Sequence, residues 1–228
     1  APGRRGRWME DSAAEEEDSL AGAAYEASEE LCSFCFDVLL ARLQDRPAPD
    51  FQAAVAAGLC RSKVGGIFVT WKAAGAKLRG CMGTLRPAWL DRGLAEFALK
   101  SALGDRRFRP VDLDEVPQLS CRVSILHSFE PCEDAYDWDI GVHGVRITFV
   151  MSSPLCPCSS TSYSATFLPE VMVEHKMSHE VAIGRLVRKA GYTGRRDEEL
   201  VDSIDATRFQ SSVKELSYDE FVQRSRNG

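Results

Sequence analysis

The heptapeptide LRGCMGT occupies residues 78–84 and places Cys81 between two glycines, Gly80 and Gly83. Glycines this closely spaced allow a strand to bend and let a neighbouring backbone or a ligand approach it. The preceding run GIFVTW, residues 66–71, is rich in β-branched and aromatic side chains and predicts a strand. A turn containing Gly75 separates the two runs, so we predict that they pair as a β-hairpin.

Helices and further strands are predicted on both sides of this hairpin. Apolar residues recur at helical spacing in residues 25–43, 90–103 and 178–190, and a capping box at residues 217–220 begins a short C-terminal helix. Strands are predicted at residues 119–126, 144–151, 164–168, 204–209 and 212–216, the last two as edge strands. Residues 152–162 are rich in Ser, Pro and Cys and predict a long, variable loop. This order favours an α+β fold with antiparallel sheets flanked by helices.

Length and composition narrow the class of protein. The 228 residues suffice for one large domain or two small ones. Residues 1–22 hold few large apolar side chains and an acidic run, so we expect a disordered leader there and a folded domain over residues 23–226. No apolar run approaches the ~20 residues of a membrane span. A net charge of −6 argues against a general nucleic-acid binder, and eight cysteines without a secretory signal favour a reduced, intracellular protein.

The candidate site is the segment around Cys81. Residues 61–90 contain six Lys or Arg residues and no Asp or Glu, and nearby cations favour the thiolate form of a cysteine. A basic segment of this kind can also bind an anionic group of a substrate. The candidate substrate-binding residues are Lys72, Arg79, Gly80, Gly83 and Thr84. A plainer interpretation stays open, in which Cys81 is a small packed side chain and the cations form a solvated strand face.

Two other cysteine pairs have less bearing on function. Cys32 and Cys35 have CxxC spacing but lie inside a helical apolar stripe, which predicts a packed core rather than a redox motif. The motif Cys156-Pro157-Cys158 and the i, i+4 pair His175 and His179 do not make a zinc motif. We therefore expect no metal and no cofactor.

The heptapeptide at residues 78–84, called the signature from here on, closely resembles the LRGC(I)GT sequence of the AMMECR family. Met82 stands in place of the usual isoleucine. Other stretches match the family in order over about residues 25–222. They are CFDVL at 35–39, FVTWK at 68–72, SAL at 101–103, RF at 107–108, CRVS at 121–124, DW at 137–138, GVHGVRI at 141–147, LPEV at 168–171, LVRKAGY at 186–192 and TRF at 207–209. The predicted loop at residues 152–162 has no counterpart in the family.

This resemblance implies an α+β fold in two unequal lobes, with the signature near a cleft between them. It also implies a cytoplasmic or nuclear protein of the eukaryotic type. Prokaryotic relatives occur with Memo-type and radical-SAM proteins, so pathway proteins of these kinds are expected partners by analogy. His143 is the histidine that lies in a matching stretch, and we pair it with Cys81 as a catalytic base. The alternative is that His143 is a turn residue.

Two functions from different classes fit these observations. The first is an enzyme, or a component of an enzymatic pathway, that binds a small anionic substrate and uses Cys81 as a reactive or substrate-contacting thiol. The second is a non-catalytic module that binds a protein, a peptide or a nucleotide. RNA contact through the basic segment is a weaker third hypothesis.

Overall fold

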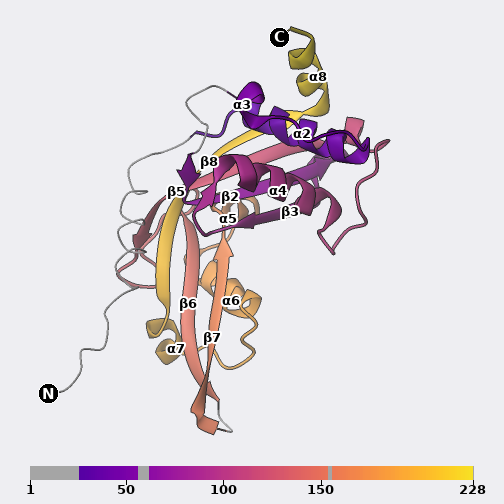
Figure 1. Cartoon of the computed structure of the whole chain (residues 1–228). Coiled ribbons are helices and arrows are strands. Elements are labelled where there is room, and N and C mark those ends of the chain that lie inside the picture. Colours follow the sequence, from indigo (N-terminus) through magenta and orange to yellow (C-terminus); the bar gives the residue numbers. More distant parts are fainter. Residues whose placement is uncertain (1–25, 56–61, 154–155, 228) are drawn as a thin grey trace, which may run out of the picture. The chain divides into compact units, whose positions relative to one another are not determined.

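The structure is a computed structural model that describes residues 26–55, 62–153 and 156–227. The predicted leader at residues 1–22 lies outside these ranges. The described residues divide into two compact units, of which the first runs to His127 and resumes at Ser212, and the second spans Ser128–Ser211. Both units combine helices with antiparallel strands, so the fold class is α+β, as predicted (Figure 1).

The sheet of the first unit is built on the predicted hairpin. Strand β2 (Gly66–Ala73) pairs antiparallel with β3 (Lys77–Thr84), and a 3-10 turn containing Gly75 joins them. Gly75 has a φ of 73°, in the left-handed region that favours glycine. On its other side β2 pairs antiparallel with β5 (Ser120–Pro131), and β8 (Asp205–Ser217) follows in the order β3-β2-β5-β8.

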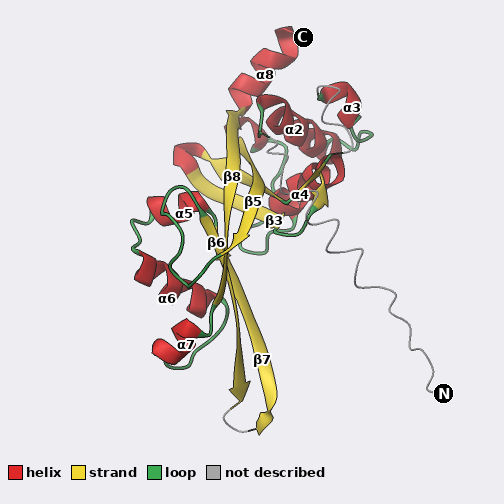
Figure 2. Ribbon diagram, turned by 90° about the vertical axis from the view of Figure 1, so that its left-hand side faces the viewer, coloured by secondary structure: helices red, strands yellow, loops and turns green. Residues whose placement is uncertain are grey.

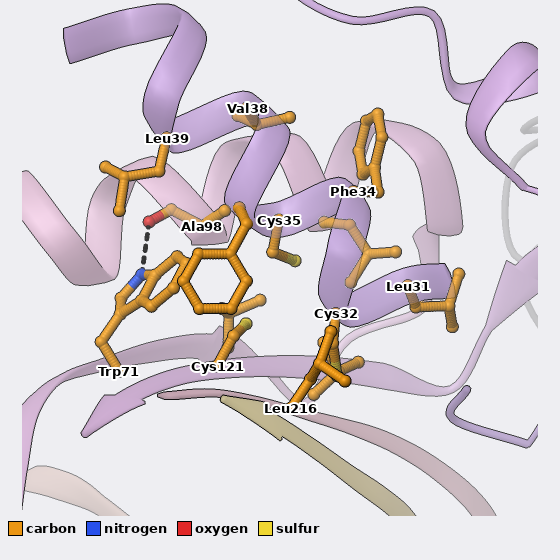
Figure 3. Packing of buried hydrophobic residues seen from close by; sticks show 14 of the residues in the cluster. Leu31, Cys32, Phe34, Cys35, Val38, Leu39, Trp71, Ala98, Cys121 and Leu216 are labelled. Carbon is orange, nitrogen blue, oxygen red and sulfur yellow. Dashed lines mark hydrogen bonds between the residues drawn. The ribbon is translucent and has the colours of Figure 1, made fainter. Parts of the chain in front are cut away.

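Two helices cover one face of this sheet. Helix α4 (Leu90–Leu103) packs on β2 and β3, and α2 (Glu29–Leu43) packs on α4 (Figure 1). The facing side chains alternate along β2, where Ile67, Val69 and Trp71 are all 0% exposed. The indole Nε1 of Trp71 donates a hydrogen bond of 3.0 Å to the carbonyl of Ala98 in α4 (Figure 3).

The CxxC pair lies in this core, as predicted. Cys32 and Cys35 are 0% exposed and lie near Cys121 of β5, which is equally buried (Figure 3). Burial raises the pKa of the Cys121 thiol well above its usual value, and hydrogen bonding with the other two cysteines adds to the effect. All three thiols therefore pack as small apolar side chains.

Short elements complete the first unit. They are α3 (Phe51–Ala54), β1 (Lys63–Val64), β4 (Ala88–Trp89), η1 (Ala74–Ala76), η2 (Val116–Gln118) and α8 (Tyr218–Asn227). The predicted capping box begins α8, because the backbone N–H of Ser217 donates to Glu220 Oε2 at 2.8 Å. The hydroxyl of Ser217 accepts the N–H of Glu220 in return.

The second unit contains a long antiparallel pair of strands. Strand β6 (Gly144–Ser153) pairs with β7 (Cys156–Phe167) on one side and with β8 on the other (Figure 2). The accompanying helices are α5 (Pro169–Glu174), α6 (His179–Lys189) and α7 (Glu198–Asp202). Helix α6 buries four apolar side chains, Ala182, Ile183, Leu186 and Val187.

Two strand predictions differ from the structure. Residues 156–162, predicted as part of a loop, belong to β7, where Thr161 pairs with Met151 and Ser162 with Val150. The two strands predicted at residues 204–209 and 212–216 form the single strand β8. In both segments backbone pairing with a distant strand outweighs local composition, because strand formation depends on the neighbouring strand more than on intrinsic preference.

Candidate functional site

The signature forms the outer strand of the sheet in the first unit. In the register of β2 and β3, Cys81 lies opposite Thr70, Gly80 opposite Trp71 and Gly83 opposite Phe68. The pairing shifts between Trp71 and Lys72, so that Arg79 has no Cα partner of its own. This irregularity is a local bulge, a feature that redirects the side chains beside it.

Both glycines of the signature are explained by close packing. A Cβ atom on Gly80 would lie 1.9 Å from the carbonyl oxygen of Ser101 in α4. A Cβ on Gly83 would lie 2.4 Å from the ring of Phe68 on the neighbouring strand. Real Cβ atoms do not approach other atoms so closely. Helix α4 and the Phe68 ring can therefore pack this close to β3 because residues 80 and 83 are glycines.

The Cys81 side chain lies on the face of the sheet opposite α4. Trp71 points into the core, so its neighbour Thr70, and Cys81 opposite Thr70, point the other way. The Thr70 hydroxyl donates to Cys81 Sγ at 3.1 Å, and the thiol is half-buried. Arg122 of β5 lies opposite Thr70 on the other side, so Cys81, Thr70 and Arg122 form one cross-strand row.

A cluster of charges adjoins this row. Glu215 of β8 accepts from Lys72 Nζ at 3.0 Å, from Arg122 Nε at 2.8 Å and from the hydroxyl of Ser120 at 2.9 Å. Burial alone would raise the pKa of Glu215, but the hydrogen bonds from Lys72, Ser120 and Arg122 outweigh it and lower the pKa. The carboxylate of Glu215 therefore joins a cation of β2 to a cation of β5.

A buried carboxylate holds the backbone of Cys81. Asp105 Oδ2 accepts the N–H of Cys81 at 3.0 Å, and the same carboxylate binds Arg107 through Nε at 2.9 Å and Nη2 at 2.6 Å. Arg107 Nη2 also donates to the carbonyl of Cys81 at 3.4 Å. The backbone N–H and carbonyl of Cys81 are thus hydrogen-bonded by side chains rather than by another strand. The edge of the sheet is therefore covered at this residue.

These contacts shift the pKa values of both side chains. Hydrogen bonds from Arg107 hold the pKa of Asp105 far below its usual range, against an opposing effect of burial. The pKa of Arg107 is raised, chiefly by its hydrogen bonds to Asp105 and further by electrostatic interaction with Asp105 and Cys81. Arg107 therefore lies close enough to Cys81 for their charges to interact.

Arg79 is engaged by a carboxylate from another part of the chain. It is 8% exposed and binds Glu115 through two hydrogen bonds, one from Nε at 2.5 Å and one from Nη2 at 2.9 Å. The remaining terminal nitrogen, Nη1, is buried and has no hydrogen-bond partner among the residues that the structure describes. Thr84, the last candidate in the signature, accepts the backbone N–H of Arg86 at 3.0 Å and so stabilises the turn after β3.

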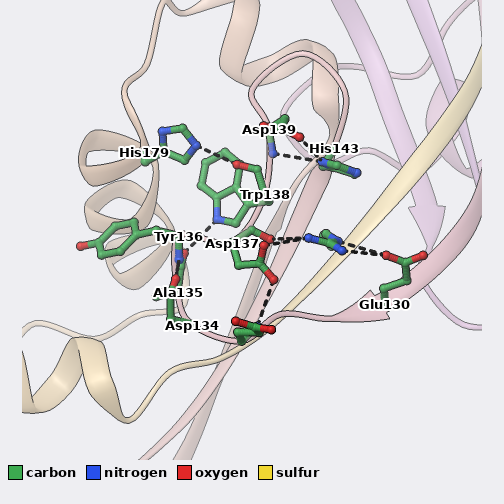
Figure 4. A network of polar contacts seen from close by, with 11 residues as sticks. Glu130, Asp134, Ala135, Tyr136, Asp137, Trp138, Asp139, His143 and His179 are labelled. Carbon is green, nitrogen blue, oxygen red and sulfur yellow. Dashed lines mark hydrogen bonds and ion pairs between the residues drawn. The ribbon is translucent and has the colours of Figure 1, made fainter.

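His143 lies in the second unit, in a loop rich in acidic residues. Its Nδ1 accepts the backbone N–H of Asp139 at 3.0 Å, so in the neutral ring Nε2 carries the proton (Figure 4). This local contact fits the alternative of a turn residue, and the pairing of His143 with Cys81 stays a prediction. In the same loop Asp137 binds Arg208, whose guanidinium also binds Glu130 (Figure 4).

The other histidine pair does not share a helix face. His175 caps the end of α5 and His179 begins α6, where its Nε2 lies 2.8 Å from the carbonyl of Trp138. Within the described part of the chain, no group of three or more His, Cys, Asp or Glu residues is arranged to hold a metal ion. No helix in that part is long and apolar enough to cross a membrane.

Sequence reasoning missed two of the three acidic partners of the site. Asp105, Glu115 and Glu215 lie outside the acid-free segment, at 24, 36 and 143 residues from the groups that they bind. The place of Asp105 directly before Arg106 and Arg107 predicts a local ion network, which its ion pair with Arg107 confirms, but the sequence gives no sign that Asp105 is buried. Nothing local to the signature points to Glu115 or Glu215.

Comparison with known proteins identifies relatives of this chain and a solved structure with the same fold. An uncharacterised protein of Arabidopsis thaliana is 39% identical over 202 residues, covering 86% of this chain and 88% of its own length. One of Schizosaccharomyces pombe is 34% identical over 198 residues, covering 85% and 94%. The crystal structure of an uncharacterised protein from Pyrococcus horikoshii has the same fold, with a TM-score of 0.68 at 24% identity over 85% of this chain and 94% of that one. The family model of AMMECR1 matches residues 32–214, and the chain therefore belongs to the AMMECR1 family.

Proposed function

We propose that the first unit binds a small anionic ligand on the sheet face opposite α4, and that the Cys81 thiol contacts this ligand. The observation that carries the proposal is the strand register, which brings Cys81, Thr70 and Arg122 into one row beside Lys72. A hydroxyl, a thiol and two cations that lie side by side on one sheet face can donate to a negatively charged group.

The surroundings of Cys81 also suit a reactive thiol. The Thr70 hydroxyl donates to the sulfur, and the guanidinium of Arg107 lies within range of its charge. A hydrogen-bond donor and a nearby cation both stabilise a thiolate more than a thiol. Asp105 is not suited to act as the base, because its carboxylate is already committed to Arg107 and to the backbone of Cys81.

The test compares two alkylating reagents on the native protein, with the modification of each cysteine measured by mass spectrometry. Iodoacetamide is neutral and iodoacetate is negatively charged, so a positive site should raise the rate with iodoacetate relative to the rate with iodoacetamide. We expect this ratio to be higher at Cys81 than at the half-buried Cys132, and the apparent pKa of Cys81 to lie below the ~8.5 of a free thiol. The buried Cys32, Cys35 and Cys121 are internal controls and should not react.

Matched variants distinguish the effect of Lys72 and Arg122 on the iodoacetate preference from the effect of general surface charge. Lys72→Gln and Arg122→Gln should lower the iodoacetate preference at Cys81, whereas Lys77→Gln should not, because Lys77 is exposed at the start of β3 and binds none of these groups. If Cys81 is inert, or if all three variants lower the preference equally, the proposal is wrong.

A binding module for a protein or peptide is the second candidate, favoured by a different observation. Trp89, directly before α4, is 46% exposed, and an exposed tryptophan can serve as the anchor of a protein interface. A protein partner bound there would be unaffected by Cys81→Ser. RNA contact is less favoured, because the chain has a net charge of −6.

A further inference from the structure

A cavity in the second unit lies between helix α6 and the loop that follows it. It has a volume of about 700 Å³, within the range of pockets that hold small molecules. The outer face of α6 contributes Gly184, Arg185 and Arg188, and the loop contributes Tyr192, Thr193 and Arg196. All of these residues belong to the second unit, whereas the residues around Cys81 belong to the first.

Most of the charged side chains that line this cavity are positive. Residues 185–196 contain five Lys or Arg residues and no Asp or Glu, in a chain with a net charge of −6. Arg185, Arg188 and Arg196 line the cavity together with one carboxylate, that of Glu180. Among the residues that the structure describes, no carboxylate forms an ion pair with Arg185 or Arg188. The dipole of α6 explains Arg188 in its last turn, but it does not explain Arg185 or Arg196.

The loop is held in place by specific packing. Arg196 Nη1 donates to the carbonyl of Glu180 at 2.8 Å. The Arg196 side chain packs on α6 at Gly184, where a Cβ atom would lie 2.4 Å from Nη1. Tyr192 packs against Phe149 and Tyr163 of the sheet, with ring centroids 5.7 and 5.4 Å away. The guanidinium of Arg196 and the ring of Tyr192 are therefore positioned before any ligand arrives.

We propose that this cavity binds the phosphate group of a small molecule, with Arg185, Arg188 and Arg196 as its ligands. Guanidinium groups match phosphate oxygens in geometry and charge, and three of them lining one cavity exceed what a monovalent carboxylate needs. The ring of Tyr192 and the side chains of Val181 and Val187 provide an apolar wall for the rest of the molecule.

Pyrophosphate is the probe, and isothermal titration calorimetry of the full chain in about 150 mM salt is the measurement. We expect saturable binding with one site per chain. Arg185→Gln and Arg188→Gln should each weaken binding about tenfold or more, because each removes charge-assisted hydrogen bonds. Arg195→Gln is the matched control: it removes the same charge from the same segment, but Arg195 does not line the cavity, so binding should be unchanged.

Three outcomes would overturn the proposal. The first is no saturable binding of pyrophosphate at this salt concentration. The second is an equal loss of affinity in all three variants, which would indicate diffuse surface charge. The third is preferential binding of single-stranded RNA, with the loss of affinity spread over Arg185, Arg188 and Arg195, because that pattern belongs to an extended polyanion.

Discussion

Asp105 accepts four hydrogen bonds, one from the signature and three from Arg107, and Asp105→Asn tests how much they stabilise the fold. The carboxylate is 5% exposed and accepts from the N–H of Cys81 at 3.0 Å and from that of Arg107 at 3.2 Å. It also accepts two bonds from the Arg107 guanidinium. Asparagine has nearly the same shape, but it carries no charge and presents an NH2 group to donors at one of its two positions.

The expected loss follows from these contacts. Hydrogen bonds to a charged group contribute about 1.5–3 kcal/mol each, and a donor left unsatisfied in a buried position costs a similar amount. Arg107 is 57% exposed and can regain solvation, so the full cost of stranding a buried charge does not apply. We therefore expect Asp105→Asn to lower the free energy of unfolding by about 2–3 kcal/mol.

Urea unfolding measures this loss, and Asp112→Asn is the matched control. Asp112 forms an ion pair with Arg109 at 2.7 Å, but both side chains are exposed, so its loss should leave the unfolding midpoint nearly unchanged. If the two variants lose the same stability, the account of Asp105 as a buried support of β3 is wrong.

The pH dependence provides a second check. The pKa of Asp105 is lowered in the folded protein from the ordinary value of 3.8, so the unfolded chain takes up the proton first as pH falls. The stability that Asp105 contributes is therefore full above its ordinary pKa and is lost as the pH falls toward the folded pKa. The difference between wild type and Asp105→Asn should shrink over that range. A difference that stays constant from about pH 7 to about pH 2 would refute the reasoning.

Two further predictions concern the same strand. Gly80→Ala should lower the free energy of unfolding by at least about 1–3 kcal/mol, since its Cβ would lie 1.9 Å from the carbonyl of Ser101; an unchanged urea midpoint would contradict the packing argument. Arg107→Gln should slow the alkylation of Cys81 at a fixed pH, because a cation that favours the thiolate is lost. Arg106→Gln, its exposed neighbour, is the control and should leave that rate unchanged.

Local periodicity was enough to predict most elements of the fold. Helix α4 has the predicted limits, Leu90–Leu103, because its apolar stripe and the glycine after it are both local signals. The β-branched and aromatic residues of the run 66–71 likewise predicted β2, and the structure adds that Ile67, Val69 and Trp71 form its buried face. Strand β7 was missed because its Ser-rich sequence carries no such signal, and its pairing with β6 is what makes it a strand.

The candidate site was predicted less completely, for a related reason. Counting charges along the segment of residues 61–90 gave six cations and no acid, which suggested cations available for a ligand. In the structure Lys72 and Arg79 are paired with Glu215 and Glu115, residues brought close by the fold. Charge along a sequence therefore overestimates the charge available at a site, because ion pairs form between residues that are distant in the chain.

The division of the chain into units has a consequence for biosynthesis. The second unit is one continuous segment, whereas the first needs residues from both sides of it, including Phe221 of α8, which stacks on Phe36 of α2 at 5.0 Å. The ribosome synthesises these residues after the second unit, so the first unit cannot complete its core until the second has been synthesised. Until then Phe36 can pack on Trp71 but lacks the ring of Phe221 that stacks on it in the folded protein.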